Sequence, residues 1–130
     1  METNIQKTVM IVQGSGIDRD LLKMAIQKKY NVVIAENDLT AERILASEPE
    51  ISIILLDTIM QTTNGFDFLE WIQSKQEYRH IPIVFTGLAG TDENILKGLT
   101  LGVRDVFVKP YDLGQVLRSI DNLLTLAEYQ

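Results

Sequence analysis

The most apolar part of the chain reads ISIILLD and spans residues 51–57. A short run of this kind, rich in Ile and Leu and without regular polar alternation, is typical of a strand buried on both faces of a parallel sheet. We therefore expect a strand over Ile51–Leu56. Four runs of the same character predict four further strands, at Thr8–Val12, Asn31–Ala35, Ile81–Phe85 and Arg104–Val108.

Between these runs the apolar residues recur at helical spacing. Ser15 and Asp18 have the spacing of a capping box for the first helix. Strict alternation of strand and helix predicts one α/β domain over residues 1–130, with a core of about residues 8–126, a parallel sheet and helices on both faces. The predicted helices contain Ile17, Leu21 and Ala25, then Ala41, Ile44 and Leu45, then Phe66, Leu69 and Ile72, followed by Thr91–Leu99 and Asp112–Leu126.

The bulk composition disfavours or excludes several classes of function and partner. The 130 residues carry a net charge of -6, which disfavours direct contact with nucleic acid or an anionic membrane. The absence of cysteine excludes disulfides, thiolate catalysis and Cys-ligated metals. The N-terminus lacks the apolar stretch of a signal peptide, and no run has the length of a membrane span, so we expect a cytoplasmic protein.

Three polar residues follow or close apolar runs: Asp57, Thr86 and Lys109. Ligand sites of open α/β sheets lie outside the carboxyl ends of the strands, so these residues should meet at one edge. A carboxylate, a hydroxyl and an ammonium gathered there are suited to accept and hold a phosphoryl group. The sequence therefore predicts a phosphoryl-accepting site.

From about Val9 to Leu124, the chain resembles the receiver domain of two-component response regulators. The resemblance implies a regulatory domain rather than an enzyme, with a flavodoxin-like (βα)5 three-layer fold and strand order 2-1-3-4-5. It also implies that Asp57 takes a phosphoryl group from a histidine kinase or phosphotransfer protein. Thr86 would hydrogen-bond that group, and Lys109, before a cis Pro110, would neutralise it. The matching segments are Ala35-Glu36-Asn37, Leu55-Leu56-Asp57 with Met60, Asn64-Gly65, Pro82 to Gly87, and Gly102 to Pro110.

The chain departs from the family where the metal is held. Receivers normally have two adjacent acids just after the first strand, but Gln13 and Gly14 stand here. Mg²⁺ prefers anionic oxygens, so the resemblance implies a weak site that retains Asp57 and the backbone carbonyl of Ile59. Two acids follow nearby, but neither is predicted to replace the missing pair, because one lies at the helix cap and the other a turn further along. These two acids are Asp18 and Asp20.

A second departure concerns signalling. Receivers usually carry Tyr or Phe three residues before the Lys, whereas this chain has Val106. Phe107 should face the other side of the strand, and Tyr111 lies beyond the Pro, so neither is predicted to substitute. Output is then expected from a constitutive surface, formed by the fourth helix, fifth strand and fifth helix, which binds a second copy or an output domain.

Two alternatives remain open at this stage. The first is a pseudo-receiver, which keeps the fold as a protein interaction module and signals without phosphorylation. The second is a nucleotide or FMN site at Gly14-Ser15-Gly16, with Glu36 at the end of the second strand. Arg19 stands where the third glycine of a dinucleotide-binding loop should be, and 130 residues cannot build both halves of such a fold.

Overall fold

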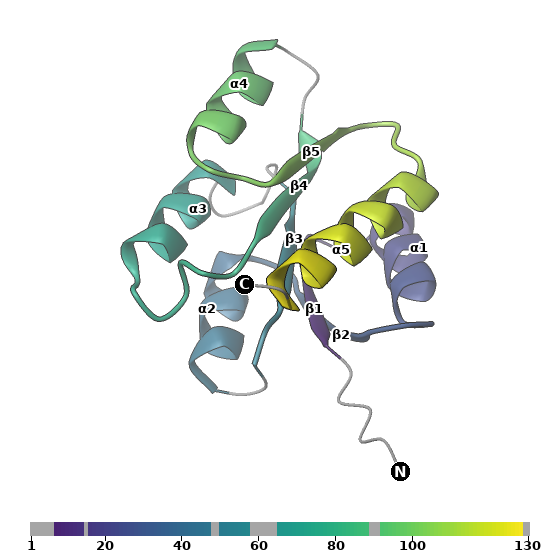
Figure 1. Ribbon diagram of the computed structural model, residues 1–130, viewed down its shortest axis with the longest axis horizontal. Coiled ribbons are helices and arrows are strands. Elements are labelled where there is room, and N and C mark those ends of the chain that lie inside the picture. The colour runs from purple at the N-terminus through teal and green to yellow at the C-terminus, as the bar shows by residue number, and fades with distance from the viewer. Residues whose placement is uncertain (1–6, 15, 48–49, 58–64, 89–91, 129–130) are drawn as a thin grey trace.

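The computed structural model describes residues 7–14, 16–47, 50–57, 65–88 and 92–128. Within these ranges strands and helices alternate along the chain around one parallel sheet (Figure 1). The strands are β1 (Thr8–Val12), β2 (Asn31–Ala35), β3 (Ile53–Leu56), β4 (Ile83–Leu88) and β5 (Asp105–Val108). The helices are α1 (Ile17–Ile26), α2 (Asp38–Ser47), α3 (Gly65–Ser74), α4 (Asp92–Thr100) and α5 (Leu113–Glu128).

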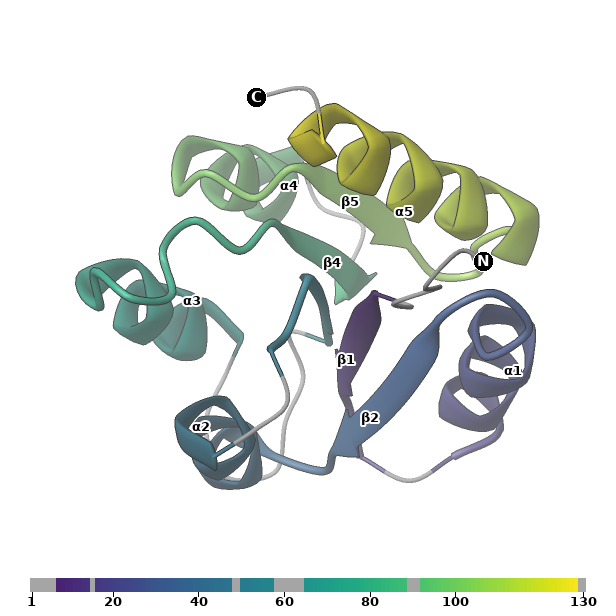
Figure 2. The same cartoon turned by 60° about the horizontal axis from the view of Figure 1, so that its bottom comes forward.

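The strand order is β2-β1-β3-β4-β5, which confirms the implied flavodoxin-like topology. Val12 pairs with both Ala35 and Leu56, and Leu56 pairs with Phe85. The carboxyl ends of the central strands therefore lie at one level. Figure 2 shows the three layers, with α1 and α5 on one face of the sheet and α2, α3 and α4 on the other.

The core is divided between the two faces of the sheet, and β3 contributes to both. Ile53 and Leu55 pack in the cluster with α1 and α5, while Ile54 and Leu56 pack in the cluster with α2 and α3. All four side chains have no exposed surface. Burying a side chain of this size stabilises a fold by roughly 1.5–3 kcal/mol, so this strand fixes the centre of the sheet.

Several element boundaries differ from the prediction. β3 begins at Ile53 rather than at Ile51, and β5 begins at Asp105. β4 begins at Ile83 and continues past its predicted end at Phe85 to Leu88. Thr86 therefore lies inside the strand, at a point where pairing with β5 shifts register. α4 and α5 each start one residue later than predicted and end slightly further along the chain.

The helix predicted from Ile17, Leu21 and Ala25 is observed as α1, but a different set of its residues faces the core. Ile17 is 76% exposed and Leu21 is 45% exposed, whereas Leu22 and Ile26 face the core. The helix has Gly16 as its N-cap, with no side-chain capping bond, so the predicted capping box is wrong. Ser15 itself lies outside the described residues. The capping prediction placed the start of the helix one residue too early, and each residue corresponds to a rotation of about 100° around the helix axis. In the described ranges, none of the helices is long and apolar enough to cross a membrane.

Candidate functional site

Asp57 directly follows β3 and is held at the centre of the sheet edge. Its backbone N–H donates to the carbonyl of Val12 at 3.0 Å, which extends the ladder between β3 and β1 by one bond. Its residue surface is only 5% exposed. A buried carboxylate requires compensation by a charge or by hydrogen bonds, because its desolvation is costly.

Lys109 supplies that charge from the end of β5. Its ammonium nitrogen lies 3.7 Å from Oδ2 of Asp57, so the predicted pairing of these two residues is observed. The Lys109–Pro110 peptide bond is cis, as the resemblance implied. The same nitrogen lies 3.4 Å from Oδ2 of Asp18, in the first turn of α1. One ammonium is therefore shared by two carboxylates.

Thr86 stands beside Asp57 on the neighbouring strand. Leu56 and Phe85 pair in register, and Asp57 and Thr86 follow them. Thr86 is 1% exposed, and its hydroxyl has no hydrogen-bond partner within the described part of the chain. Leaving such a group unpaired costs about 1–3 kcal/mol. The hydroxyl is thus available to donate to an oxyanion bound at Asp57.

Gln13 occupies the buried position after β1. Its backbone N–H donates to the carbonyl of Ala35 at 2.9 Å, and its residue surface is 6% exposed. Its side-chain oxygen Oε1 is buried and finds no hydrogen-bond partner among the residues that the structure describes. An open hollow of about 420 Å³ lies above it, lined by Gln13, Gly14, Gly16, Ile17, Asp18, Asp57 and Lys109.

Asp18 belongs to this site, contrary to its predicted role at a helix cap. Because Gly16 is the N-cap, Asp18 lies in the first turn with its carboxylate directed to Lys109. Asp20 also lies in the first turn of α1, rather than a turn further along, but it does not line the hollow, and its Oδ1 is 3.9 Å from Nε of Arg19. The sequence signal was an acid five residues beyond Gln13, and only the position of the helix start shows that it reaches the site.

Tyr111 is a second residue that the sequence argument set aside. Its hydroxyl is buried, and it has no hydrogen-bond partner in the ranges described. Burial, followed by the negative charges of Asp18 and Asp57, raises the pKa of Tyr111 to about 12. The phenol is therefore close enough for both carboxylates to affect its pKa. It also lines a smaller hollow with Asp18, Lys109 and Pro110.

Val106 occupies the place of the usual aromatic. It packs against the cluster that contains Phe85, whereas Phe107 packs against the opposite cluster, as predicted from strand alternation. Ile59, the remaining predicted contributor to a metal site, lies outside the described residues. Among residues whose placement is described, no group of three or more His, Cys, Asp or Glu could hold a metal ion.

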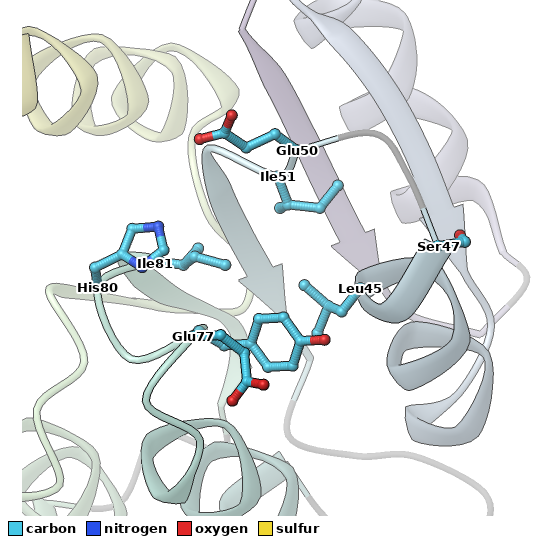
Figure 3. Close-up of a pocket in the computed structure, with 8 residues that line it drawn as sticks. Leu45, Ser47, Glu50, Ile51, Glu77, His80 and Ile81 are labelled. Carbon is cyan, nitrogen blue, oxygen red and sulfur yellow. The ribbon is translucent and has the colours of Figure 1, made fainter.

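A second hollow, of about 370 Å³, lies at the opposite end of the sheet between the end of α2 and the turn after α3 (Figure 3). Its walls are mixed, with polar Ser47, Glu50, Glu77 and His80 beside four apolar or aromatic side chains. His80 is exposed, as expected for a loop histidine. This hollow shares none of its lining residues with the site around Asp57. It is lined by Leu45, Ser47, Glu50, Ile51, Glu77, Tyr78, His80 and Ile81.

Known proteins share both the sequence pattern and the fold. The sequence-family model that describes the response regulator receiver domain matches residues 9–121 of this chain. A two-component response regulator of Oryza sativa subsp. japonica is 30% identical over 117 residues, which cover 89% of this chain. The matched part is 56% of that relative, so this chain spans little more than half its length.

Two solved structures have the same fold at low identity. A response regulator receiver protein from Pseudomonas putida superimposes with a TM-score of 0.84 at 22% identity, over 92% of this chain and 99% of that one. The Mn²⁺-bound form of the response regulator Rcp1 gives a TM-score of 0.76 at 19% identity, over 90% and 91% of the two chains. The family model covers most of the chain and the topology agrees with it, so this chain belongs to the response regulator receiver domain family.

Proposed function

We propose that residues 8–126 form the core of a single receiver domain that accepts a phosphoryl group on Asp57. The donor would be the histidine kinase or phosphotransfer protein of a two-component system. Receiver domains are regulatory rather than enzymatic, and they interact with such donors. The observation that carries the proposal is the Lys109 ammonium, 3.7 Å from a carboxylate that is otherwise buried.

The chemistry follows from the positions of three side chains. An oxygen of Asp57 attacks the phosphorus atom of a phosphohistidine, a P–O bond forms, and the P–N bond breaks with its electron pair remaining on the imidazole. The acyl phosphate has more negative charge than the carboxylate it replaces. Lys109 offsets that charge, and the buried hydroxyl of Thr86 donates a hydrogen bond that it otherwise lacks among the described residues.

The site offers oxygen donors for a divalent cation, but fewer anionic ones than the family pattern. Receiver domains typically use Mg²⁺, and the Rcp1 structure contains Mn²⁺. Carboxylate and amide oxygens are the hard ligands that Mg²⁺ accepts, and Asp57 and Gln13 present them here. A bound Mg²⁺ would neutralise charge on the phosphoryl oxygens. With Gln13 and Gly14 in place of the two acids, we propose that this cation binds weakly.

Mass spectrometry after incubation with acetyl phosphate and Mg²⁺ tests the proposal. We expect one phosphoryl group per chain, located at Asp57 and absent from Asp57→Asn. Asp67→Asn is a matched control, because Asp67 is an exposed acid in the first turn of α3. Label on the Asp57→Asn variant equal to that on the unaltered chain would contradict the assignment.

A pseudo-receiver that signals without phosphorylation is the second candidate. The replacement of the acidic pair by Gln13 and Gly14, and of the switch aromatic by Val106, favours it. The same mass measurement separates the two candidates, because a pseudo-receiver would remain unlabelled at every Mg²⁺ concentration. The nucleotide alternative has less support, since Arg19 stands where the third glycine of a dinucleotide-binding loop should be.

Two exposed apolar surfaces fit the partners of such a domain. Beside the site, α1 presents Ile17, Leu21 and Met24 to solvent, and we propose that a phosphodonor docks there. On the face formed by α4, β5 and α5, Leu96 and Leu99 are exposed, and we propose that this face binds a second copy or an output domain.

A further inference from the structure

Asp18 approaches the site from an unexpected element. The family pattern places acids directly after the first strand, whereas Asp18 lies on the first turn of α1. Its Oδ2 is 3.4 Å from the Lys109 nitrogen, which is 3.7 Å from Oδ2 of Asp57. One oxygen from each carboxylate therefore lies next to the same position, and the Lys109 nitrogen occupies that position.

Gln13 adds an independent observation. Its Oε1 is buried without a hydrogen-bond partner in the described ranges, and Gln13 lines the same hollow as the two carboxylates. A buried carbonyl oxygen that lacks a hydrogen-bond donor can be satisfied by a bound cation or an ordered water. Gln13, Asp18 and Asp57 thus provide one amide oxygen and two carboxylates as ligands for a cation.

The surroundings allow a hydrated ion to enter. The side chains of Lys109 and Asp18 are 44% and 55% exposed, so their ion pair contributes little and a competing cation can displace it. Mg²⁺ keeps several of its waters and is commonly held by one or two carboxylates. Arg19, the basic residue next to Asp18 in the sequence, does not line the hollow, and its guanidinium lies nearer Asp20 and Glu36, at 3.9 and 3.8 Å.

We propose that Asp18 replaces the missing acidic pair and forms, with Asp57 and Oε1 of Gln13, a relocated divalent-cation site that Lys109 fills when no metal is bound. The inference rests on the proposed function for its biological use. Its physical content is separate: a divalent ion and the Lys109 ammonium compete for the same two carboxylates.

Competition predicts effects of opposite sign from two substitutions. We expect Asp18→Asn to raise the dissociation constant for Mn²⁺ or Mg²⁺ about tenfold, because one of two anionic ligands becomes neutral. We expect Lys109→Met to lower it about tenfold, because the two carboxylates lose their internal cation. A purely structural role for Asp18 would not produce this pair of results.

The experiment is a titration of the isotopically labelled full chain with Mn²⁺, followed by paramagnetic broadening of amide signals, with Mg²⁺ as a diamagnetic competitor. Broadening should centre on Gln13, Asp18 and Asp57. Asp20→Asn is the matched control, because it removes the same charge from the same helix but from outside the hollow. Its dissociation constant should stay within about twofold of the unaltered chain, since surface charges screened by salt act weakly.

Three outcomes would overturn the inference. These are equal weakening by Asp18→Asn and Asp20→Asn, no tightening by Lys109→Met, and an absence of broadening near Asp18 in the unaltered chain. Asp18→Glu keeps the charge and should retain most of the binding, which guards against a fold defect. The titration contains no phosphodonor, so it is independent of the phosphorylation test. A chain that binds Mn²⁺ through Asp18 but is never phosphorylated would refute only the proposed function. A chain that is phosphorylated at Asp57 but does not bind Mn²⁺ through Asp18 would refute only this inference.

Discussion

Gly87 lies directly against the carboxylate of Asp57. A Cβ atom at position 87 would overlap both carboxylate oxygens and the carbon between them. β4 therefore forms a wall beside Asp57, and that wall can be close only because the residue after Thr86 has no side chain. The position of the carboxylate is set by backbone as well as by charge.

We expect Gly87→Ala to keep the fold and to displace the Asp57 carboxylate. A misplacement of this order lowers reaction rates by up to about 100-fold, so labelling by acetyl phosphate should fall by about tenfold or more. Gly14→Ala is the comparison for an added methyl group in the same hollow, because Gly14 lines it but a Cβ at position 14 meets no atom within 4 Å. Mass spectrometry gives the rate and circular dichroism the fold; an unchanged rate in Gly87→Ala would show that Asp57 adapts freely.

Restoring the family's acids should restore tight cation binding. In the double variant Gln13→Asp and Gly14→Asp, we expect calorimetry to show Mg²⁺ binding at least about tenfold tighter than in the unaltered chain. Because position 13 is buried, the metal-free variant should be less stable, and Mg²⁺ should raise its melting temperature. Equally tight binding by the unaltered chain would mean that the loss of the pair has little consequence.

Phosphorylation should leave the face formed by α4, β5 and α5 nearly unchanged. A bound group shifts an equilibrium only through different affinities for its states, and Val106 lacks the ring that would distinguish two positions. On adding beryllofluoride as a phosphoryl mimic, we expect NMR shift changes around Asp57 and Thr86 that do not spread along this face. Changes that extend through Val106 to Leu96 and Leu99 would reveal an active switch.

Tyr111 should make stability fall in alkaline solution. Its pKa is raised from 10.0 in a free tyrosine to about 12, chiefly by burial and then by Asp18 and Asp57. The folded state therefore holds the phenolic proton more tightly, so its contribution is complete below pH 10 and is lost as pH rises toward 12. Urea unfolding across this range should show a decline that Tyr111→Phe reduces. In Asp18→Asn, tyrosinate absorbance should report a lower pKa for Tyr111.

Two adjacent leucines of α1 test which face of the helix is buried. Leu22 is 1% exposed, and Leu22→Ala should lower the free energy of unfolding by about 2–5 kcal/mol, because it leaves a cavity. Leu21 is largely outside the core, and Leu21→Ala should change it by about 0.5 kcal/mol or less. Denaturation by urea measures both, and equal effects would contradict the assigned face.

The sequence was sufficient for the fold and for the central pair of the site. Continuous apolar runs such as Ile53–Leu56, alternating with segments of helical period, are typical of strands inside a parallel sheet, so the strands and their common edge could be predicted. That edge was enough to bring Lys109 to Asp57. Val106 and Phe107 were correctly placed on opposite faces, because successive side chains of a strand point to opposite sides.

Only the tertiary structure decided which neighbours complete the site. Whether Asp18 faces Lys109 depends on the rotation of α1, and a shift of one residue in the helix start changes that direction by about 100°. Tyr111 lies near Asp18 and Asp57 because of the path of the chain beyond β5, which local spacing does not determine. The sheet that positions the strand ends can be predicted from the pattern of apolar residues. Helix rotation and loop path cannot, because they depend on packing between segments that are far apart along the chain.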